Sequence, residues 1–207
     1  MKIKQSKFKI IVIVGPTAVG KTSASVELAM RIGGEVISAD SRQAYCGLDI
    51  GPGKVTTDEM RGIPHHLLDV VKPTERFTVA DFVRLGREKI LEISARGNIP
   101  LVVGGTGFYV DALVGRASIP EVKPNSKLRE KLVDVSNEKL FEMLKDLDAN
   151  RAENIDSKNR VRLIRAIEIV TELGAVPETQ LSDLYDVLWI GLTLENGALH
   201  ERIHTRL

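Results

Sequence analysis

The 207 residues of the chain are enough to bury a sizeable core, and its 43% apolar and 28% charged fractions are ordinary for a soluble globular protein. Its 29 basic and 28 acidic residues balance, so net charge does not indicate a nucleic-acid partner, and any such binding must come from local clusters. The only cysteine, Cys46, excludes an internal disulfide and a cysteine-rich zinc site, and no apolar stretch is long enough to span a bilayer. We therefore expect a cytoplasmic protein.

The first half of the chain alternates between strand and helix patterns. Five β-branched or aliphatic residues, Ile10–Val14, predict a strand that is buried on both faces, as in a parallel sheet. A glycine-containing loop follows, and then a helix is predicted over Lys21–Ile32, ended by Gly33 and Gly34. Glu35–Ser38 predicts a second short strand.

A similar unit comes next. Thr78 and Asp81 form the sequence pattern of a capping box, which predicts a helix that stops near Gly97. Ile99–Val103 predicts another buried strand, which ends in Gly104-Gly105-Thr106-Gly107. This alternation predicts right-handed strand–helix–strand units and a doubly wound parallel sheet flanked by helices.

The pattern changes in the second half. Residues 126–173 show helical periodicity and no strand signal, and Arg160–Leu173 is the strongest single helix, closed by Gly174. Val187–Leu194 returns to a strand pattern, in which we expect Trp189 to be part of the core. We therefore predict an α/β P-loop fold with three parts: residues 1–120 form the first part of the core, 121–183 a helical insertion, and 184–207 the return to the core. A helix that starts near Leu199 has little chain after it, so we expect the sequence to be a C-terminally truncated form.

The strongest motif is a phosphate-binding loop of the form G-x-x-x-x-G-K-[ST]. Its glycines let backbone N–H groups point at an anion, and the following helix adds the positive end of its dipole. Lys21 can reach terminal phosphate oxygens and Thr22 can hold Mg²⁺. The loop does not identify what carries the phosphates, because ATP, GTP and an allylic diphosphate all satisfy it. It consists of Gly15, Pro16, Thr17, Ala18, Val19, Gly20, Lys21 and Thr22.

Asp40 follows the strand after the P-loop helix. Ligands of doubly wound sheets lie outside the carboxyl ends of the strands, so Asp40 should face the phosphate site. There it can act as a general base, although a helix cap or a magnesium-associated acid remains an alternative. The strand Ile99–Val103 ends in glycine and threonine and lacks the aspartate of a Walker B metal site, which argues against a motor or switch nucleotidase but not against a small-molecule kinase.

Five ordered motifs resemble the tRNA dimethylallyltransferase (IPP transferase) family. They are Gly15–Thr22, Ile37–Tyr45, Leu48–Gly51, Pro64–Asp69 and Val102–Tyr109, and the resemblance continues through Arg162–Glu168 and Arg202–Arg206. The loop Gly51–Val55 departs from the family pattern at its second and last positions.

The resemblance implies transfer of a dimethylallyl group from dimethylallyl diphosphate to an adenosine amine beside the tRNA anticodon, with Mg²⁺ and without a membrane, by a monomer. By similarity, Asp40 is the general base, and Lys21, Thr22 and Arg206 stabilise the departing diphosphate. Thr22 is also the metal-binding residue. The resemblance assigns tRNA contacts to Asp40, Ser41, Arg42, Gln43, Thr106, Arg129, Val161, Arg162, Leu163, Ile164 and Arg165.

Two other functions fit parts of the sequence. A small-molecule or nucleoside kinase shares the P-loop, the position of Asp40 and a helical lid, and a non-catalytic RNA-binding fragment would keep the fold alone. An allylic donor should occupy a small apolar space beside the phosphates with no slot for a purine ring, whereas a kinase needs an adenine pocket. From the residues alone, Arg129 indicates an exposed helix position, and Arg160–Arg165 fits a solvated basic face equally well. His65 and His66 favour a structural role.

Overall fold

The computed structural model describes residues 8–177 and 184–206, and these divide into two compact units. The core unit contains residues 8–117 and 184–206, and the helical unit contains residues 118–177. Among the described residues, no helix is both long and apolar enough to cross a membrane.

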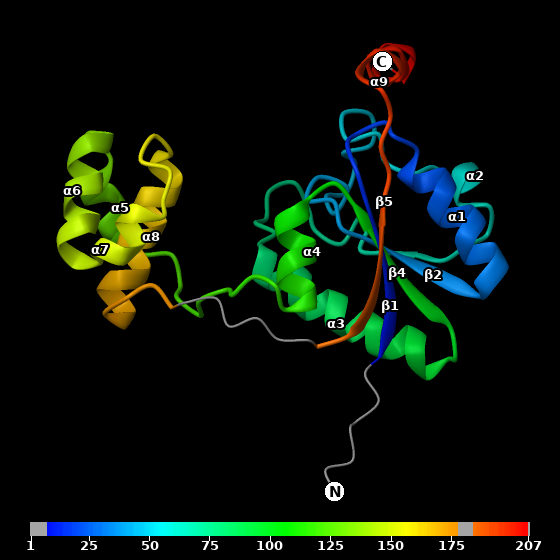
Figure 1. Cartoon of the computed structure of the whole chain (residues 1–207), viewed down its shortest axis with the longest axis horizontal. Helices are drawn as coiled ribbons and strands as arrows, with labels where there is room; N and C mark the ends of the chain where they lie inside the picture. The colour runs from blue at the N-terminus through cyan, green and yellow to red at the C-terminus, as the bar shows by residue number, and fades with distance from the viewer. Residues whose placement is uncertain (1–7, 178–183, 207) are drawn as a thin grey trace, which may run out of the picture. The chain divides into compact units, whose positions relative to one another are not determined.

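The core unit is built on a parallel five-stranded sheet in the order β3-β2-β4-β1-β5 (Figure 1). A strand is found at each predicted position, and the apolar run forms β1, an interior strand of the sheet. Val12 pairs with Val102 on one side and with Trp189 on the other, so β1 has a neighbour along each edge. The strands are β1 (Lys9–Val14), β2 (Gly34–Ser38), β3 (His65–His66), β4 (Ile99–Gly104) and β5 (Asp186–Gly191).

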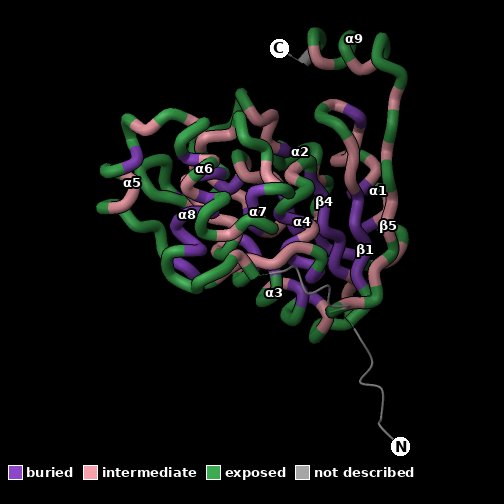
Figure 2. Tube along the Cα trace, turned by 60° about the vertical axis from the view of Figure 1, so that its left-hand side comes forward, coloured by how far each residue is buried: buried purple, intermediate pink, exposed green. Residues whose placement is uncertain are grey.

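Helices flank this sheet, as predicted. Figure 1 shows α1 and α2 on one side of the strands and α3 and α4 on the other. Successive residues within β1, whose side chains point to opposite faces of the sheet, are buried, because helices cover both faces. Figure 2 shows the buried residues along β1 and β4. The helices are α1 (Lys21–Ile32), α2 (Thr57–Met60), α3 (Val79–Ala95), α4 (Gly107–Val114) and α9 (Asn196–Arg206).

The predicted helix boundaries are also confirmed at α1 and α3. Gly33 ends α1 in the left-handed conformation that glycine adopts most readily. The Thr78 side chain accepts a hydrogen bond from the N–H of Asp81, and the Asp81 side chain accepts one from the N–H of Thr78. This reciprocal capping box fixes where α3 begins.

The prediction that Trp189 belongs to the core is wrong. β5 lies at the edge of the sheet and ends at Gly191, earlier than the predicted Leu194. Trp189 is only partly buried, and the guanidinium of Arg116 lies 4.3 Å from the centroid of its ring. An edge strand leaves the amphipathic indole room for a cation–π contact at the surface.

Glu35 is a buried carboxylate in β2, with its side chain 5% exposed. Its oxygens accept hydrogen bonds from Arg96 at 2.8 and 3.1 Å and from Asn98 at 2.7 Å, and His66 Nε2 lies 2.7 Å from Oε2. Burial alone would raise the pKa of Glu35, but these hydrogen bonds outweigh it and lower the pKa to about 2. His66 therefore has a structural contact.

The lowered pKa of Glu35 predicts a loss of stability in acid. A carboxylate with a folded pKa below its unfolded value stabilises the fold above the unfolded pKa of 4.5, and this contribution disappears as the pH falls toward 2. We expect wild type to exceed Glu35→Gln in unfolding free energy by at most about 3 kcal/mol near neutral pH. Urea titrations should show a smaller difference in unfolding free energy between the two proteins at about pH 3 than near neutral pH. An equal difference at both pH values would show that it does not come from the lowered pKa of Glu35.

The helical unit contains α5 (Ser126–Leu132), α6 (Asn137–Leu147), α7 (Ala149–Glu153) and α8 (Arg160–Leu173), and no strand among its described residues. The limits predicted for α8 are confirmed. Each helix begins after a residue whose side-chain oxygen accepts a backbone hydrogen bond, and these caps are Asn125, Ser136, Asp148 and Asn159. The core of the unit is formed by Leu132, Leu140, Leu144, Ala152, Leu163, Ala166, Ile167 and Val170.

A buried carboxylate organises one side of this unit. Glu168 is 2% exposed, and Arg129 binds both of its oxygens, at 2.6 and 2.9 Å. Arg165 Nη1 and the backbone N–H of Asn125 complete the set at 3.2 and 2.9 Å. Burial would raise the pKa of Glu168, but the hydrogen bonds from Arg129, Asn125 and Arg165 outweigh it, and the pKa is lowered. The interpretation of Arg129 as a simple exposed position is therefore wrong, because sequence spacing does not reveal a partner 39 residues away.

This contact predicts that Arg129 matters for stability. Arg129→Ala should lower the unfolding free energy by about 2–4 kcal/mol, because it leaves a buried carboxylate with fewer partners. Arg162 is exposed on α8, so Arg162→Ala should stay within about 0.5 kcal/mol of wild type. Urea unfolding followed by circular dichroism compares the two. Equal unfolding free energies of the two variants would show that the Arg129–Glu168 pair makes no net contribution to stability.

Candidate functional site

The P-loop connects β1 to α1 and curls through unusual backbone angles. Gly15, Ala18 and Gly20 have positive φ values of 154°, 64° and 100°. A side chain at Gly15 would also collide with the chain, since its Cβ would lie 2.5 Å from the carbonyl oxygen of Leu192. No side chain caps the start of α1, so its first N–H groups remain directed at the loop, as anion binding requires.

Lys21 lies at the first position of α1, and its side chain folds over the loop. Its Nζ donates to the carbonyl oxygens of Gly15 and Pro16, at 2.9 and 2.7 Å. These carbonyls hold the ammonium group above the loop, where an anion bound to the loop N–H groups would meet it. Thr22 follows it in the wall of the same cavity.

The loops that follow β2 and β4 are hydrogen-bonded to each other beside the P-loop. The N–H of Ala39 donates to Val103 O at 2.8 Å, and the N–H of Thr106 donates to Ala39 O at 3.3 Å. The N–H of Ser41 donates to Thr106 Oγ1 at 3.2 Å. These bonds bring Asp40 and Thr106, which are 66 positions apart in the sequence, to one edge of the sheet.

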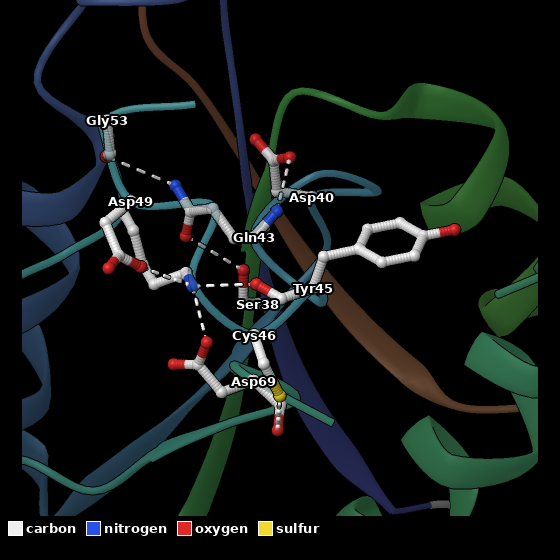
Figure 3. A network of polar contacts seen from close by, with 9 residues as sticks. Ser38, Asp40, Gln43, Tyr45, Cys46, Asp49, Gly53 and Asp69 are labelled. Carbon is white, nitrogen blue, oxygen red and sulfur yellow. Dashed lines mark hydrogen bonds and ion pairs between the residues drawn. The ribbon is translucent and has the colours of Figure 1, made fainter. Parts of the chain in front are cut away.

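Asp40 is held by its own turn. Its Oδ1 accepts hydrogen bonds from the N–H groups of Arg42 and Gln43, at 2.8 and 3.3 Å (Figure 3). No described residue donates to its Oδ2. One carboxylate oxygen therefore fixes the side chain, and the other can accept a proton from a substrate.

A polar network supports the loop that faces Asp40 (Figure 3). Lys54 Nζ is almost buried and bonds Tyr45 O at 2.9 Å, Asp49 Oδ1 at 2.7 Å and Asp69 Oδ1 at 2.5 Å. These three bonds of Lys54 fix the turn over residues 49–54. This turn contains the loop Gly51–Val55 almost entirely, where the sequence departs from the family pattern. Gln43 extends the network, since its Nε2 donates to Gly53 O at 3.4 Å.

These elements enclose a cavity of about 270 Å³. It brings the P-loop, Lys21, Thr22 and Asp40 together, as the sequence predicted. The expectation of an apolar space holds for only part of the wall, because polar side chains from β2, β3 and α2 also reach it. The wall consists of Thr17, Ala18, Gly20, Lys21, Thr22, Ser23, Ser25, Val36, Ser38, Asp40, Gln43, Pro52, Gly53, Val55, Glu59, His65, Val103, Gly104, Gly105 and Arg202.

One buried polar atom in this wall has no partner among the described residues. His65 Nε2 is shielded from solvent, while its Nδ1 lies 2.8 Å from the carbonyl oxygen of Ile63. Burial lowers the pKa of His65, which favours the neutral ring, and the carbonyl partner of Nδ1 makes this nitrogen the donor and Nε2 an acceptor. No group of three or more described His, Cys, Asp or Glu residues is arranged to hold a metal ion on its own.

Arg202 is a cavity residue that the sequence did not single out. It lies on α9, and its Nη1 is 3.3 Å from the carbonyl oxygen of Val19. Arg206 was predicted instead, and its side chain lies outside the part of the chain that the structure describes. The sequence could have indicated Arg202, because it belongs to the same motif as Arg206 and residues four apart lie on one face of a helix.

The residues predicted to contact tRNA fall in both units. Asp40, Ser41, Arg42, Gln43 and Thr106 lie at the carboxyl edge of the sheet, and the others lie in the helical unit. On α8, Val161 is 77% exposed and Arg162 is exposed, whereas Leu163 is fully buried. Ile164 and Arg165 are partly buried.

Arg160 also has a local contact. It donates to the carbonyl oxygens of Leu132 and Val133, at 2.5 and 2.6 Å, and so closes the end of α5. Of Arg160, Arg162 and Arg165, Arg162 is the one whose side chain makes no hydrogen bond or ion pair with another described residue.

Known proteins are similar to this chain in sequence and fold. The family model described as IPP transferase matches residues 43–207, and the model described as Isopentenyl transferase matches residues 8–75. A tRNA dimethylallyltransferase from Anoxybacillus flavithermus is 43% identical over 204 residues, and one from Pediococcus pentosaceus is 45% identical over 206 residues. Each match covers 96% of this chain, which spans 66% of the length of either relative.

Two solved structures extend the comparison. A full-length tRNA isopentenylpyrophosphate transferase from Bacillus halodurans has a TM-score of 0.66 and 42% identity, covering 97% of this chain and 65% of that one. A eukaryotic dimethylallyltransferase acting on tRNA has a TM-score of 0.84 and 30% identity, covering 96% of this chain and 51% of that one. With a family model matching most of its length and a parallel P-loop sheet in common with these structures, the chain belongs to the IPP transferase family.

Proposed function

We propose that this protein transfers a dimethylallyl group from dimethylallyl diphosphate to the exocyclic N6 amine of an adenosine beside the tRNA anticodon. The observation that carries the proposal is the shared cavity, in which a phosphate-binding loop and the carboxylate of Asp40 line one space. The names of the relatives support the same reaction and do not support the kinase alternative.

The P-loop would bind the diphosphate of the donor. Its backbone N–H groups and the start of α1 supply fixed donors, and Lys21 adds a positive charge. The N6 amine would attack the first carbon of the dimethylallyl group as the bond from that carbon to the diphosphate oxygen breaks. Negative charge then grows on the leaving diphosphate, which is where these donors stabilise it.

Asp40 would take the proton that the adenosine amine loses. Its Oδ1 is fixed by two backbone N–H groups, which leaves Oδ2 to face the amine. The adenosine must leave its stack to reach Asp40, as for other enzymes that modify a base. Thr106, held next to Ser41, would contact the RNA near this base.

We infer that Mg²⁺ accompanies the diphosphate. Mg²⁺ in proteins is usually bound by one or two side-chain oxygens together with substrate phosphates, and Thr22 offers such an oxygen in the cavity wall. The ion would neutralise part of the diphosphate charge. Thr22 would hold it through the side-chain hydroxyl.

The RNA substrate would be an anticodon stem-loop, contacted by the residues after β2 and by the helical unit. Arg162, exposed on α8, would contact phosphates, which position an RNA without reading its sequence. We expect a monomer that acts in the cytoplasm, where tRNA is found.

Calorimetry with Mg²⁺ tests the donor. Dimethylallyl diphosphate should bind this protein more tightly than ATP. The Lys21→Ala variant should fold but lose binding of both the donor and pyrophosphate. Tighter binding of ATP would favour a kinase, and unchanged pyrophosphate affinity in the Lys21→Ala variant would remove the P-loop assignment.

A further inference from the structure

We propose that Arg202 is a second cationic ligand of the diphosphate, in addition to Lys21. The inference rests on the proposed function for the identity of the donor, but it concerns the anion alone. It also assigns α9 a part in the site, since Arg202 projects from this helix into the wall of the P-loop cavity.

The position of Arg202 follows from the path of the chain. β5 runs parallel to β1, and the N–H of Leu192 donates to Val14 O at 2.9 Å, so the end of β5 lies directly beside the start of the P-loop. The contact is close enough that a Cβ at Gly15 would meet Leu192 O at 2.5 Å. α9 begins a few residues later, at Asn196, so its first turns start from an anchored point.

The guanidinium of Arg202 then lies against the loop itself. Its Nη1 is 3.3 Å from Val19 O and would be 3.4 Å from a Cβ at Gly20. Val19 and Gly20 directly precede Lys21, so the guanidinium and the ammonium group flank the same turn of backbone. A diphosphate on the loop N–H groups would lie within reach of both cations.

The present contact of Arg202 is weak enough to be exchanged. A bond of 3.3 Å to a neutral carbonyl is longer than usual, whereas guanidinium groups form short, paired hydrogen bonds with phosphate oxygens. Arg61 and Arg96, two other arginines of the core unit, pair instead with carboxylates, Glu27 and Glu35 respectively. No described carboxylate forms an ion pair with Arg202, so its charge is available to an anion.

Arg202 and Lys21 would bind the diphosphate in different ways, because their side chains differ in shape. Lys21 is a point charge, whereas the planar fork of Arg202 can bind two oxygens at once and thereby orient the diphosphate. A fixed orientation matters for transfer because the bond to the leaving oxygen must point away from the attacking amine. Arg202 would also meet the charge that grows on that oxygen.

Titration of pyrophosphate with Mg²⁺ tests this assignment without any prenyl transfer. Arg202→Gln should weaken pyrophosphate binding by about tenfold or more, which is the loss expected for hydrogen bonds to a charged group. Arg202→Lys should recover part of the affinity. Arg84→Gln is the matched control, since Arg84 is exposed on α3 and pairs only with Glu88 among the described residues, and it should bind as wild type does.

A chemical measurement on the unchanged protein avoids any question of folding. Pyrophosphate should protect Arg202, but not Arg84, from an arginine-directed dicarbonyl reagent, as read by peptide mass spectrometry. Equal affinity in folded Arg202→Gln and wild type, or no protection of Arg202 by bound pyrophosphate, overturns the inference. If pyrophosphate binds through Arg202 but dimethylallyl diphosphate has no advantage over ATP, the inference stands and the proposed function fails.

Discussion

Replacement of Asp40 by asparagine is expected to lower the rate of prenyl transfer by about 10²–10⁴-fold, the usual contribution of a positioned general base. Binding of pyrophosphate should stay close to wild type, because in the proposed reaction Asp40 acts on the amine and the P-loop binds the anion. Asparagine is a suitable probe since its oxygen can still accept from the N–H groups of Arg42 and Gln43, so the turn is preserved. The substitution removes the negative charge and, with it, the ability to take a proton.

Single-turnover transfer to an anticodon stem-loop, with calorimetry of pyrophosphate alongside, measures both effects. Asp58→Asn is a matched control, because Asp58 is exposed in α2 and lies outside the cavity wall. It should react at the wild-type rate. A loss of less than about tenfold in Asp40→Asn would reduce Asp40 to a positioning group.

The second large effect is expected at Gly104, where β4 ends. A Cβ at this position would lie 2.2 Å from the carbonyl oxygen and 2.4 Å from the carbonyl carbon of Ala39, and neither atom can move without shifting β2. Gly104→Ala should therefore lower the unfolding free energy by about 3 kcal/mol or more, at the upper end of overpacking effects. It should also displace Asp40, the next residue after Ala39, and so weaken catalysis.

Gly107 provides the control from the same motif. It begins α4, and no atom lies within 4 Å of the Cβ that an alanine would place there. Gly107→Ala should leave stability unchanged or raise it by up to about 1 kcal/mol, since alanine favours helices. Thermal and urea unfolding compare the two variants, and equal stabilities would contradict the proposed close approach of β2 and β4.

Local features of the sequence predicted much of this fold. The apolar run at β1 has no alternation, so it required a sheet covered on both faces, and the capping box of Thr78 and Asp81 located the start of α3. The limits of α8 followed from its periodicity and from Gly174. The P-loop pattern and the position of Asp40 after β2 were sufficient to predict a shared site, because parallel strands present their carboxyl ends at one edge.

Contacts between distant segments could not be predicted in this way. Arg202 reaches Val19 across 183 positions, and Arg129 reaches Glu168 across 39. Nothing in the local sequence distinguishes these arginines from solvated ones, because their partners are supplied by the packing of other elements. The same reason applies to the contact between Lys54 and Asp69, which lie 15 positions apart.

The central claim is that the cavity beside the P-loop serves prenyl transfer to adenosine, and product analysis tests it most directly. The protein is incubated with Mg²⁺, an anticodon stem-loop and either dimethylallyl diphosphate or ATP, and the RNA is digested to nucleosides for mass spectrometry. We predict an N6-dimethylallyl adenosine beside the anticodon with dimethylallyl diphosphate, and none with ATP or with the Lys21→Ala variant. Phosphate transfer from ATP to a small acceptor, without any prenylated adenosine from dimethylallyl diphosphate, would contradict the claim.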